Sequence, residues 1–323
     1  MVHPGAALCQ RHRLHLRPSG GTHMISVIIP HLNQPEALRR GLAALQRQEG
    51  CSLPFEIIVV DNGSHQLPTQ ICASYDQVSL LSQPVPGPGP ARNLGVASAR
   101  GDILAFIDAD CVAGPGWLAA IEGHFHNAPD ASVIGGDVRI LQQQPGRPTM
   151  LEAYESVFAF RMKKYIDEKG FTGGGNLAVR AWVFRKVGGF LGINIAEDTE
   201  WGQRASAMGY RVRYEPKMIV QHPARRNFAE LVDKWDRHIA HDLREIRQSA
   251  NWRSRWTLRA FAVLVSPLTE IPRIAASDRL SGLRARTLAM LGVTRIRFYR
   301  GIAMLNEAKN AGGSGAAARW NRS

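Results

Sequence analysis

Short runs of apolar residues, many of them β-branched, recur along the first third of the chain and predict buried strands. These runs occupy residues 25–29, 55–60, 78–81 and 103–107. After the first run, Leu38, Leu42 and Leu45 fall on one face of a predicted helix, which Asn33 can cap and in which Pro35 occupies the first turn. Strands that alternate with helices predict an α/β fold with a mostly parallel central sheet.

The rest of the chain shows longer helical patterns and shorter strands. We expect a loop rich in Pro and Gly at 84–90 and helices over 91–99, 151–169, 196–208 and 227–248. The remaining apolar runs predict short strands at 177–179, 212–214 and 218–220. The chain is therefore expected to hold an α/β catalytic domain over 24–222, a helical C-terminal region over 223–311 and a disordered tail over 312–323.

Acidic side chains follow two of the predicted strands. Asp61 comes directly after the second run, and Asp108 and Asp110 come directly after the fourth. Ligands bind at the carboxyl ends of the strands in open α/β sheets. Two neighbouring carboxylates suit Mg²⁺ or Mn²⁺ together with substrate phosphates, and a single Asp can accept the N–H of a uracil or guanine. The structural alternative for each is an ordinary polar turn.

Further segments carry side chains that suit ligand chemistry. Arg92 can pair with a phosphate or stack on a base, and the glycines of 173–175 let the backbone approach a ligand. Glu197 and Asp198 open a predicted helix, where a carboxylate can serve as a general base. His222 follows the last strand and can bind a metal. The alternatives are a surface arginine, a hinge, a helix cap and a plain polar contact.

Charge is distributed unevenly along the chain. Forty Lys and Arg against 27 Asp and Glu give a net charge of +13, of which residues 1–222 carry +2 and residues 223–323 carry +11. This asymmetry indicates an anionic partner, lipid headgroups or nucleic acid, with a solvated basic surface as the alternative. Since no nucleic-acid motif is present, nucleic acid is not expected. An anionic membrane surface is the expected partner of a group of basic, aromatic and aliphatic residues: Trp252, Arg253, Arg255, Trp256, Arg259, Phe261, Arg295, Arg297, Phe298, Tyr299, Arg300, Ile302, Met304 and Leu305.

Cysteine usage and hydropathy exclude several classes of protein. The four cysteines form no CxxC pair, which argues against a zinc ribbon, an iron–sulfur protein and a disulfide scaffold. No apolar run reaches the ~20 residues that span a bilayer. Residues 1–23 lack the apolar core of a signal peptide and are expected to be a disordered leader or to precede the true start. Free thiols suit a reducing compartment, so we expect a cytoplasmic protein, peripheral on the inner face of the plasma membrane.

Six segments in a fixed order identify a family resemblance. They are SVIIP, VVDNGS, GPARNLGVASARGDILAFIDAD, TGGGN, AEDTEW and IVQH, between Ile25 and about His222. In this order the chain resembles the family 2 glycosyltransferases of the GT-A fold. The resemblance implies an inverting hexosyltransferase that uses a nucleotide-diphosphate sugar, UDP being the expected nucleotide, and a carbohydrate or lipid-linked acceptor. It also implies a role in cell-surface polysaccharide or glycolipid synthesis.

The same resemblance implies a role for individual residues. Asp110 and His222 would bind Mg²⁺ or Mn²⁺, Asp198 would be the catalytic base, and Glu197 and Trp201 would lie in the acceptor region. The residues implied to bind the donor are Pro30, Asp61, Arg92, Asp108, Gly174, Gly175 and Asn176. Asp61 would contact the base with Arg92 beside it, and Asp108 would contact the ribose or the metal.

The chain departs from this pattern after the first strand, and two other functions stay open. His31 stands where relatives usually carry a hydroxyl or Tyr, which affects details of the nucleotide pocket. One alternative is a binding protein on a catalytically altered GT-A scaffold, against which the complete set of Asp110, Asp198 and His222 argues. The other is a nucleotidyltransferase, but these usually carry a glycine-rich basic loop where residues 31–35 read His-Leu-Asn-Gln-Pro.

Overall fold

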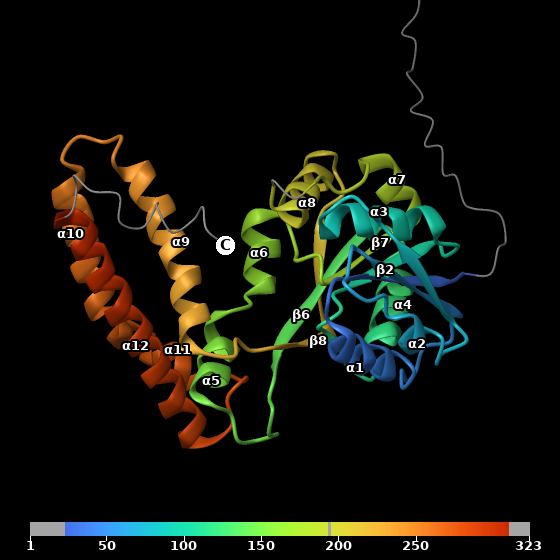
Figure 1. Ribbon diagram of the computed structural model, residues 1–323, viewed down its shortest axis with the longest axis horizontal. Coiled ribbons are helices and arrows are strands. Elements are labelled where there is room, and N and C mark those ends of the chain that lie inside the picture. The colour runs from blue at the N-terminus through green and yellow to red at the C-terminus, as the bar shows by residue number, and fades with distance from the viewer. Residues whose placement is uncertain (1–22, 193–194, 310–323) are drawn as a thin grey trace, which may run out of the picture.

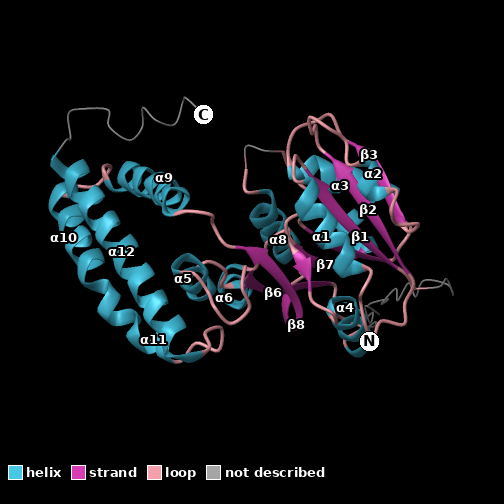
Figure 2. Ribbon diagram, turned by 60° about the horizontal axis from the view of Figure 1, so that its bottom comes forward, coloured by secondary structure: helices cyan, strands magenta, loops and turns pink. Residues whose placement is uncertain are grey.

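The computed structural model describes residues 23–192 and 195–309 (Figure 1). A sheet with flanking helices occupies one end of the molecule and a group of helices occupies the other, as both ribbon views show (Figures 1 and 2). The tail predicted over 312–323 lies outside the described residues, as does the leader predicted over 1–23 apart from His23.

The sheet has eight strands in the order β3-β2-β1-β4-β7-β6-β8-β5. Their bounds are β1 (Ile25–His31), β2 (Phe55–Asp61), β3 (Val78–Ser82), β4 (Ile103–Ile107), β5 (Val112–Ala113), β6 (Val133–Leu141), β7 (Asn176–Arg180) and β8 (Val212–Pro223). Strands β1 to β4 pair in parallel, as do β6 and β8, while β7 and β5 run antiparallel to their neighbours. The predicted α/β fold with a mostly parallel sheet is thus confirmed. Its register pairs His31 with Asp61 at the carboxyl end of the sheet.

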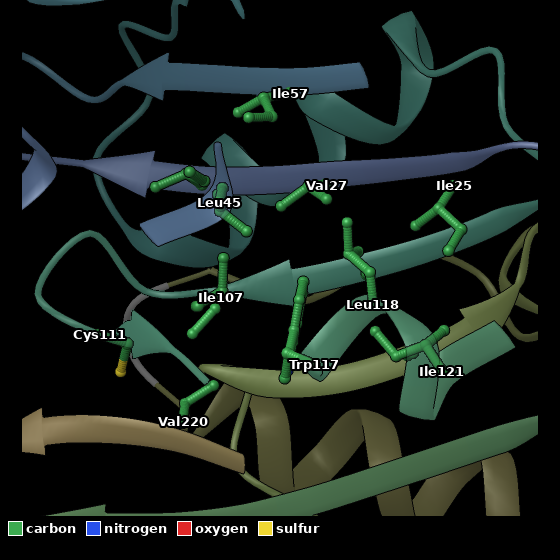
Figure 3. Close-up of a cluster of buried hydrophobic side chains, with 14 of the residues drawn as sticks. Ile25, Val27, Leu45, Ile57, Ile107, Cys111, Trp117, Leu118, Ile121 and Val220 are labelled. Carbon is green, nitrogen blue, oxygen red and sulfur yellow. The ribbon is translucent and has the colours of Figure 1, made fainter. Parts of the chain in front are cut away.

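Helices bury both faces of the central strands β1, β2 and β4, which explains why these strands are mostly apolar. The helices of this part are α1 (Pro35–Leu45), α2 (Thr69–Cys72), α3 (Pro88–Ser98), α4 (Trp117–Asn127), α7 (Ala181–Val187) and α8 (Glu197–Ala207). On one face, α1 contributes Leu45 and α4 contributes Trp117 and Ile121 to a single cluster (Figure 3). On the other, Phe184 of α7 and Trp201 of α8 pack over β4 and β7.

The predicted helical C-terminal region consists of α9 (Phe228–Ile246), α10 (Trp252–Val265), a 3₁₀ turn η1 (Ser266–Glu270), α11 (Ile271–Ala275) and α12 (Gly282–Lys309). Trp256 is fully buried and donates its indole N–H to the carbonyl oxygen of Met304 at 2.9 Å, and Met304 is itself buried. These two residues therefore hold α10 against α12 and are not available to a membrane. Among the described residues, no helix is long and apolar enough to cross a bilayer.

Three details of the sequence prediction are wrong. Asn33 does not cap α1, because it adopts a left-handed conformation (φ 52°) and its side chain accepts the backbone N–H of His65 at 2.9 Å. The strands predicted at 212–214 and 218–220 are one strand, β8, which a register shift opposite β6 interrupts. Strand β6 itself was not predicted, since Gly135 and Gly136 break its apolar run.

The single helix predicted over 151–169 is also wrong. It is two helices, α5 (Met150–Phe158) and α6 (Met162–Lys169), with Arg161 at the N-cap of the second. The break follows from their different partners: α5 packs against α12, whereas α6 packs against β6 and β8. Tyr154 and Val157 of α5 consequently share one core with Leu231 and Val293 of the C-terminal helices. The predicted border at residue 222 falls at the end of β8 but does not separate two cores.

An ion pair joins the helices to the sheet. Asp137 of β6, with 4% of its side chain exposed, pairs with Arg279, which also donates to the carbonyl oxygen of Val138 at 2.9 Å. Arg139 approaches the same carboxylate at 3.1 Å, but its own side chain is 44% exposed. Because Arg279 precedes α12, this contact fixes the helical region against strand β6 of the catalytic part.

We expect Asp137→Ala to lower the free energy of unfolding by about 1–3 kcal/mol, since it leaves the Arg279 guanidinium without its partner. The control is Arg139→Ala, whose loss from an exposed pair should change stability by less than about 1 kcal/mol. Urea unfolding followed by circular dichroism measures both. Equal effects of the two substitutions would show that the Asp137–Arg279 contact does not join the two parts.

Candidate active site

Asp61 lies at the end of β2 with its carboxylate held on both oxygens. Oδ1 is 2.9 Å from Nδ1 of His31, and Oδ2 accepts the backbone N–H of Gly63 at 3.2 Å and of Ser64 at 3.0 Å. Burial alone would raise the pKa of Asp61, but the hydrogen bonds from Ser64, His31 and Gly63 lower it below its ordinary value. The carboxylate is therefore ionised and fixed in direction at neutral pH.

His31 is a site residue to which the sequence prediction gave no role. It is 1% exposed, and its Nε2 accepts the backbone N–H of Gln34 at 3.2 Å. Nδ1 is therefore the nitrogen that donates a hydrogen bond to Asp61 Oδ1. The signal was present in the sequence: both residues end neighbouring strands, and a parallel register brings such residues together.

The two aspartates after β4 take different partners. Asp110 Oδ2 lies 3.5 Å from Nε2 of His222, whereas Asp108 Oδ1 accepts from Arg92 at 2.6 Å. His222 donates from Nδ1 to the carbonyl oxygen of Pro223 at 2.7 Å, which turns Nε2 toward Asp110. Burial raises the pKa of Asp110, His222 opposes this rise, and the nearby Asp108 adds to it. Two carboxylates and an imidazole nitrogen are donors that fit Mg²⁺ or Mn²⁺.

A second group of possible ligands lies on α9. Ligand atoms of His241, Asp242 and Glu245 lie within 4.8 Å of one another, but His241 and Glu245 are exposed. Asp242 also pairs with Arg259 at 2.6 Å. Surface acidic groups of this kind are common without a metal, so the group carries no assignment.

Arg92 connects the β4 carboxylates to the start of α8. It is 3% exposed, and it donates to Asp108 at 2.6 Å and to Glu197 at 2.8 Å. Burial alone would lower the pKa of Arg92, but Asp108 and Glu197 raise it. The guanidinium therefore stays charged, and it holds two acidic segments that are 89 residues apart in the sequence (108 and 197) at one place.

The glycine-rich loop before β7 lies directly on these charges. A Cβ at Gly174 would stand 2.8 Å from the Arg92 guanidinium carbon, and one at Gly175 would stand 2.4 Å from Asp108 Oδ2. The backbone N–H of Gly174 donates to Asp198 Oδ2 at 3.3 Å, and Oδ1 of that residue accepts from Thr199 N–H at 2.7 Å. Only glycine lets the backbone come this close to Arg92 and Asp108. The Gly174 N–H of the same loop holds Asp198 near them.

The Asn176 side chain is occupied by the fold. It is 1% exposed, its Oδ1 accepts the Trp117 indole N–H at 2.9 Å, and its Nδ2 donates at 2.9 Å to the carbonyl oxygens of Asp137 and Met218. These contacts join β7, α4, β6 and β8. Its role in donor binding stays a prediction. Because the side chain is buried, Asn176 would act on the donor only through the position of the glycine loop.

Trp201 is also an internal residue. It is 1% exposed, stacks on Phe184 at 5.5 Å between ring centroids and donates its indole N–H to Gly188 at 2.8 Å. Because its side chain is buried, Trp201 would affect an acceptor only through the residues that it packs against. Pro30 is partly exposed near the end of β1, opposite Val60. The structure thus brings together Arg92, Asp108, Gly174, Gly175, Glu197 and Asp198, and separately Asp110 with His222.

The comparison with protein families agrees with this arrangement. Residues 26–188, just over half of the chain, match the model of glycosyl transferase family 2. The chain belongs to this family. The match covers both aspartate segments and the glycine loop, but it ends before Asp198 and His222.

Curated glycosyltransferases are similar over about two-thirds of the chain. Glycosyltransferase AglE of Haloferax volcanii is 33% identical over 220 residues, which cover 65% of this chain and 70% of that protein. The pre-mycofactocin glycosyltransferase of Mycobacterium tuberculosis is 28% identical over 218 residues, which cover 64% of this chain. The match spans only 44% of the mycobacterial protein.

A solved structure supports the fold. The mannosyltransferase PcManGT of Pyrobaculum calidifontis, solved in complex with GDP-Man and Mn²⁺, has a TM-score of 0.51 at 17% identity. The alignment covers 90% of this chain and 88% of that one. This family 2 chain therefore has the GT-A-type fold that its motifs predict.

We expect Asn176→Ala to lower the free energy of unfolding by about 2–4 kcal/mol, because it leaves the Trp117 indole N–H and two carbonyl oxygens buried without partners. Asn306→Ala, at an exposed position of α12, is the matched control and should be neutral. Urea unfolding and nucleotide-sugar binding are measured on both variants. Unchanged stability with lost donor affinity would instead place Asn176 in contact with the donor.

Proposed function

We propose that the protein transfers a hexose from a nucleotide-diphosphate sugar to an acceptor hydroxyl, with inversion at the anomeric carbon. The observation that carries the proposal is the bridge of Arg92 between Asp108 and Glu197. It places Asp108, which is proposed to bind the sugar donor, beside the start of α8, where the candidate base lies. Asp198 follows Glu197 directly and contacts the glycine loop. One base and no nucleophile suit a single attack opposite the leaving group.

A divalent cation, Mg²⁺ or Mn²⁺, would be held by Asp110 and His222 with Asp108 beside them. When bound, such a cation stabilises the charge that develops on the leaving diphosphate. Mn²⁺ in the related mannosyltransferase structure supports a divalent metal here. The approach of His222 Nε2 to Asp110 Oδ2 at 3.5 Å supports these two residues as its ligands.

The remaining roles belong to side chains of this protein. Asp61, ionised and fixed by His31, would accept an N–H of a uracil or guanine base. Of these two we propose UDP as the donor nucleotide. Asp198 would remove the acceptor proton, since its carboxylate lies in the first turn of a helix and is oriented by the Gly174 N–H. Gly174 and Gly175, whose backbone lies against Arg92 and Asp108, would line the site of the donor sugar.

We propose a carbohydrate or lipid-linked acceptor and a place in cell-surface polysaccharide or glycolipid synthesis, in the cytoplasm at the inner face of the plasma membrane. The uneven charge of the chain supports this context, because the excess of basic residues follows residue 222.

The first experiment is a thermal-shift screen of UDP-, GDP- and dTDP-sugars with Mn²⁺ and with Mg²⁺, followed by hydrolysis of each donor that stabilises the protein. A donor that binds the native state raises the melting temperature by mass action. Stabilisation by UDP-sugars with slow, metal-dependent hydrolysis is expected. Donor binding without turnover would instead favour the catalytically altered scaffold, and a GDP-sugar as the best ligand would replace UDP.

We expect Asp110→Ala to remove metal-dependent donor binding, because no other carboxylate contacts His222 among the described residues. Donor affinity with Mn²⁺ should fall to the value measured with EDTA. Asp130→Ala, at an exposed carboxylate, is the control and should bind as the wild type does. An Asp110→Ala protein that still gains affinity from Mn²⁺ would remove Asp110 from the metal site.

We expect Asp198→Asn to bind the donor and to lose transfer, because an amide keeps the shape but cannot take a proton. Loss of a general base typically costs ~10²–10⁴ in rate. Asp167→Asn on the exposed side of α6 controls for the loss of one negative charge. Wild-type turnover of Asp198→Asn would exclude it as the base, whereas lost donor binding would assign it to the diphosphate.

A further inference from the structure

Exposed apolar side chains are concentrated in the C-terminal helices. Of the sixteen large hydrophobic residues that are exposed in the described part of the chain, nine lie between residues 258 and 302. These nine are Leu258, Phe261, Val265, Leu268, Ile271, Leu283, Leu291, Phe298 and Ile302. Single exposed apolar residues are ordinary on a protein surface, but a continuous group of them marks an interaction site.

On α10 these side chains form a stripe. Leu258, Phe261 and Val265 recur at intervals of three and four residues and are 54–72% exposed. Trp256 and Ala260 lie on the opposite side of the helix and are fully buried. Helix α10 is therefore apolar on both sides, of which only one is covered.

The second stripe lies on α12. Leu291, Phe298 and Ile302 are spaced by seven and four residues, so they share one side of the helix, and they are 51–54% exposed. On another side, Tyr299 donates to Asp236 of α9 at 2.8 Å. The stripe of α12 is thus directed away from α9.

The two stripes are brought together by a close contact between the helices. A Cβ at Gly301 of α12 would stand 2.4 Å from the Leu264 side chain and 3.2 Å from the carbonyl oxygen of Ala260, so glycine allows α10 and α12 to touch. Phe261 and Val265 lie within one turn of this contact on α10, as Phe298 and Ile302 do on α12. Figures 1 and 2 both show α10 and α12 side by side, at the end of the molecule far from the sheet.

Positive charge is in excess in the helices that form this surface. Residues 252–309 contain eleven Lys and Arg against three Asp and Glu. Arg255 beside the α10 stripe and Arg284 in line with the α12 stripe are exposed. Neither makes an ion pair with a described residue. A basic rim around an apolar surface matches the charge and depth profile of an anionic lipid interface, and it opposes pairing with an equally basic second copy.

We propose that the outer surface of α10 and α12, defined by Leu258, Phe261, Val265, Leu291, Phe298 and Ile302, docks on an anionic lipid bilayer. The helices lie along the surface, the apolar stripes enter the interface, and the arginines contact lipid phosphates. This inference specifies the membrane attachment named above but does not depend on sugar transfer. Lipid binding and donor turnover are separate measurements, and either can fail alone.

The experiment measures co-sedimentation of the full chain with vesicles of phosphatidylcholine alone and with 30% phosphatidylglycerol (about a third anionic lipid, as a typical test surface), at low and physiological salt. Two double variants test the surface: Phe261→Ser with Phe298→Ser, and Arg255→Glu with Arg284→Glu. Their matched controls on the catalytic part are Leu67→Ser with Met208→Ser, and Arg40→Glu with Arg185→Glu, all at exposed positions.

The wild type and both controls should bind the anionic vesicles, weakly at high salt, and should not bind phosphatidylcholine alone. Each basic residue near such a surface contributes about fivefold, so the arginine double variant should lose about 20-fold or more in partition, and the phenylalanine double variant about tenfold or more. Donor hydrolysis and melting temperature should stay those of the wild type in all variants.

Three results would overturn the proposal. These are no binding to anionic vesicles, equal losses in the controls and the surface variants, or equal binding to the anionic and the phosphatidylcholine vesicles. Gel filtration of the same proteins gives the fourth outcome: a dimer that the phenylalanine variant dissociates would assign this surface to a second copy of the chain.

Discussion

A buried guanidinium between two carboxylates is the interaction on which the candidate active site depends. A charge at the depth of Arg92 is tolerated only if it is paired, and each of its two partners comes from a different part of the chain. Asp108 follows the central strand β4, and Glu197 is the first residue of helix α8. Because one arginine pairs with both carboxylates, the loop after β4 and the start of α8 are held in fixed positions relative to each other. The spacing between the loop after β4 and the start of α8, which carry the proposed metal ligand Asp110 and the proposed base Asp198, is thereby set by a single side chain.

The glycine loop follows from the same constraint. Its backbone passes close to the Arg92 guanidinium and to Asp108, where a side chain of any size would collide. Below it, Asn176 fixes the loop to three other elements through a buried amide. The site is therefore built in layers: the sheet, an amide that fixes the loop, and the backbone N–H of Gly174, which donates to Asp198. Preorganised dipoles of this kind contribute to catalysis because they need no rearrangement during the reaction.

Much of this could be predicted from the sequence, and the failures have physical causes. The parallel strands were predictable because burial on both faces makes them continuously apolar, and the carboxylates after them were predictable because strand ends meet at one edge. Strand β6 was missed because Gly135 and Gly136, where a Cβ would collide with Thr172 and the Met218 carbonyl oxygen, interrupt its apolar pattern. The break between α5 and α6 depends on α12, which lies more than a hundred residues away. The burial of Asn176 and Trp201 likewise arises from tertiary packing that no local motif encodes.

Helix α5 belongs to the catalytic part by sequence and to the C-terminal helices by packing. The buried carboxylate of Glu155 on this helix pairs with Arg225, in the segment that leads out of the sheet, and Tyr154 packs against the close approach at Gly292. The exchangeable unit of this architecture is therefore discontinuous. A recombination that swapped the chain after β8 would separate α5 from its partners, whereas one that carried residues 149–158 along with the C-terminal helices would transfer an intact core. Such a transfer needs three breakpoints, one on each side of α5 and one after β8.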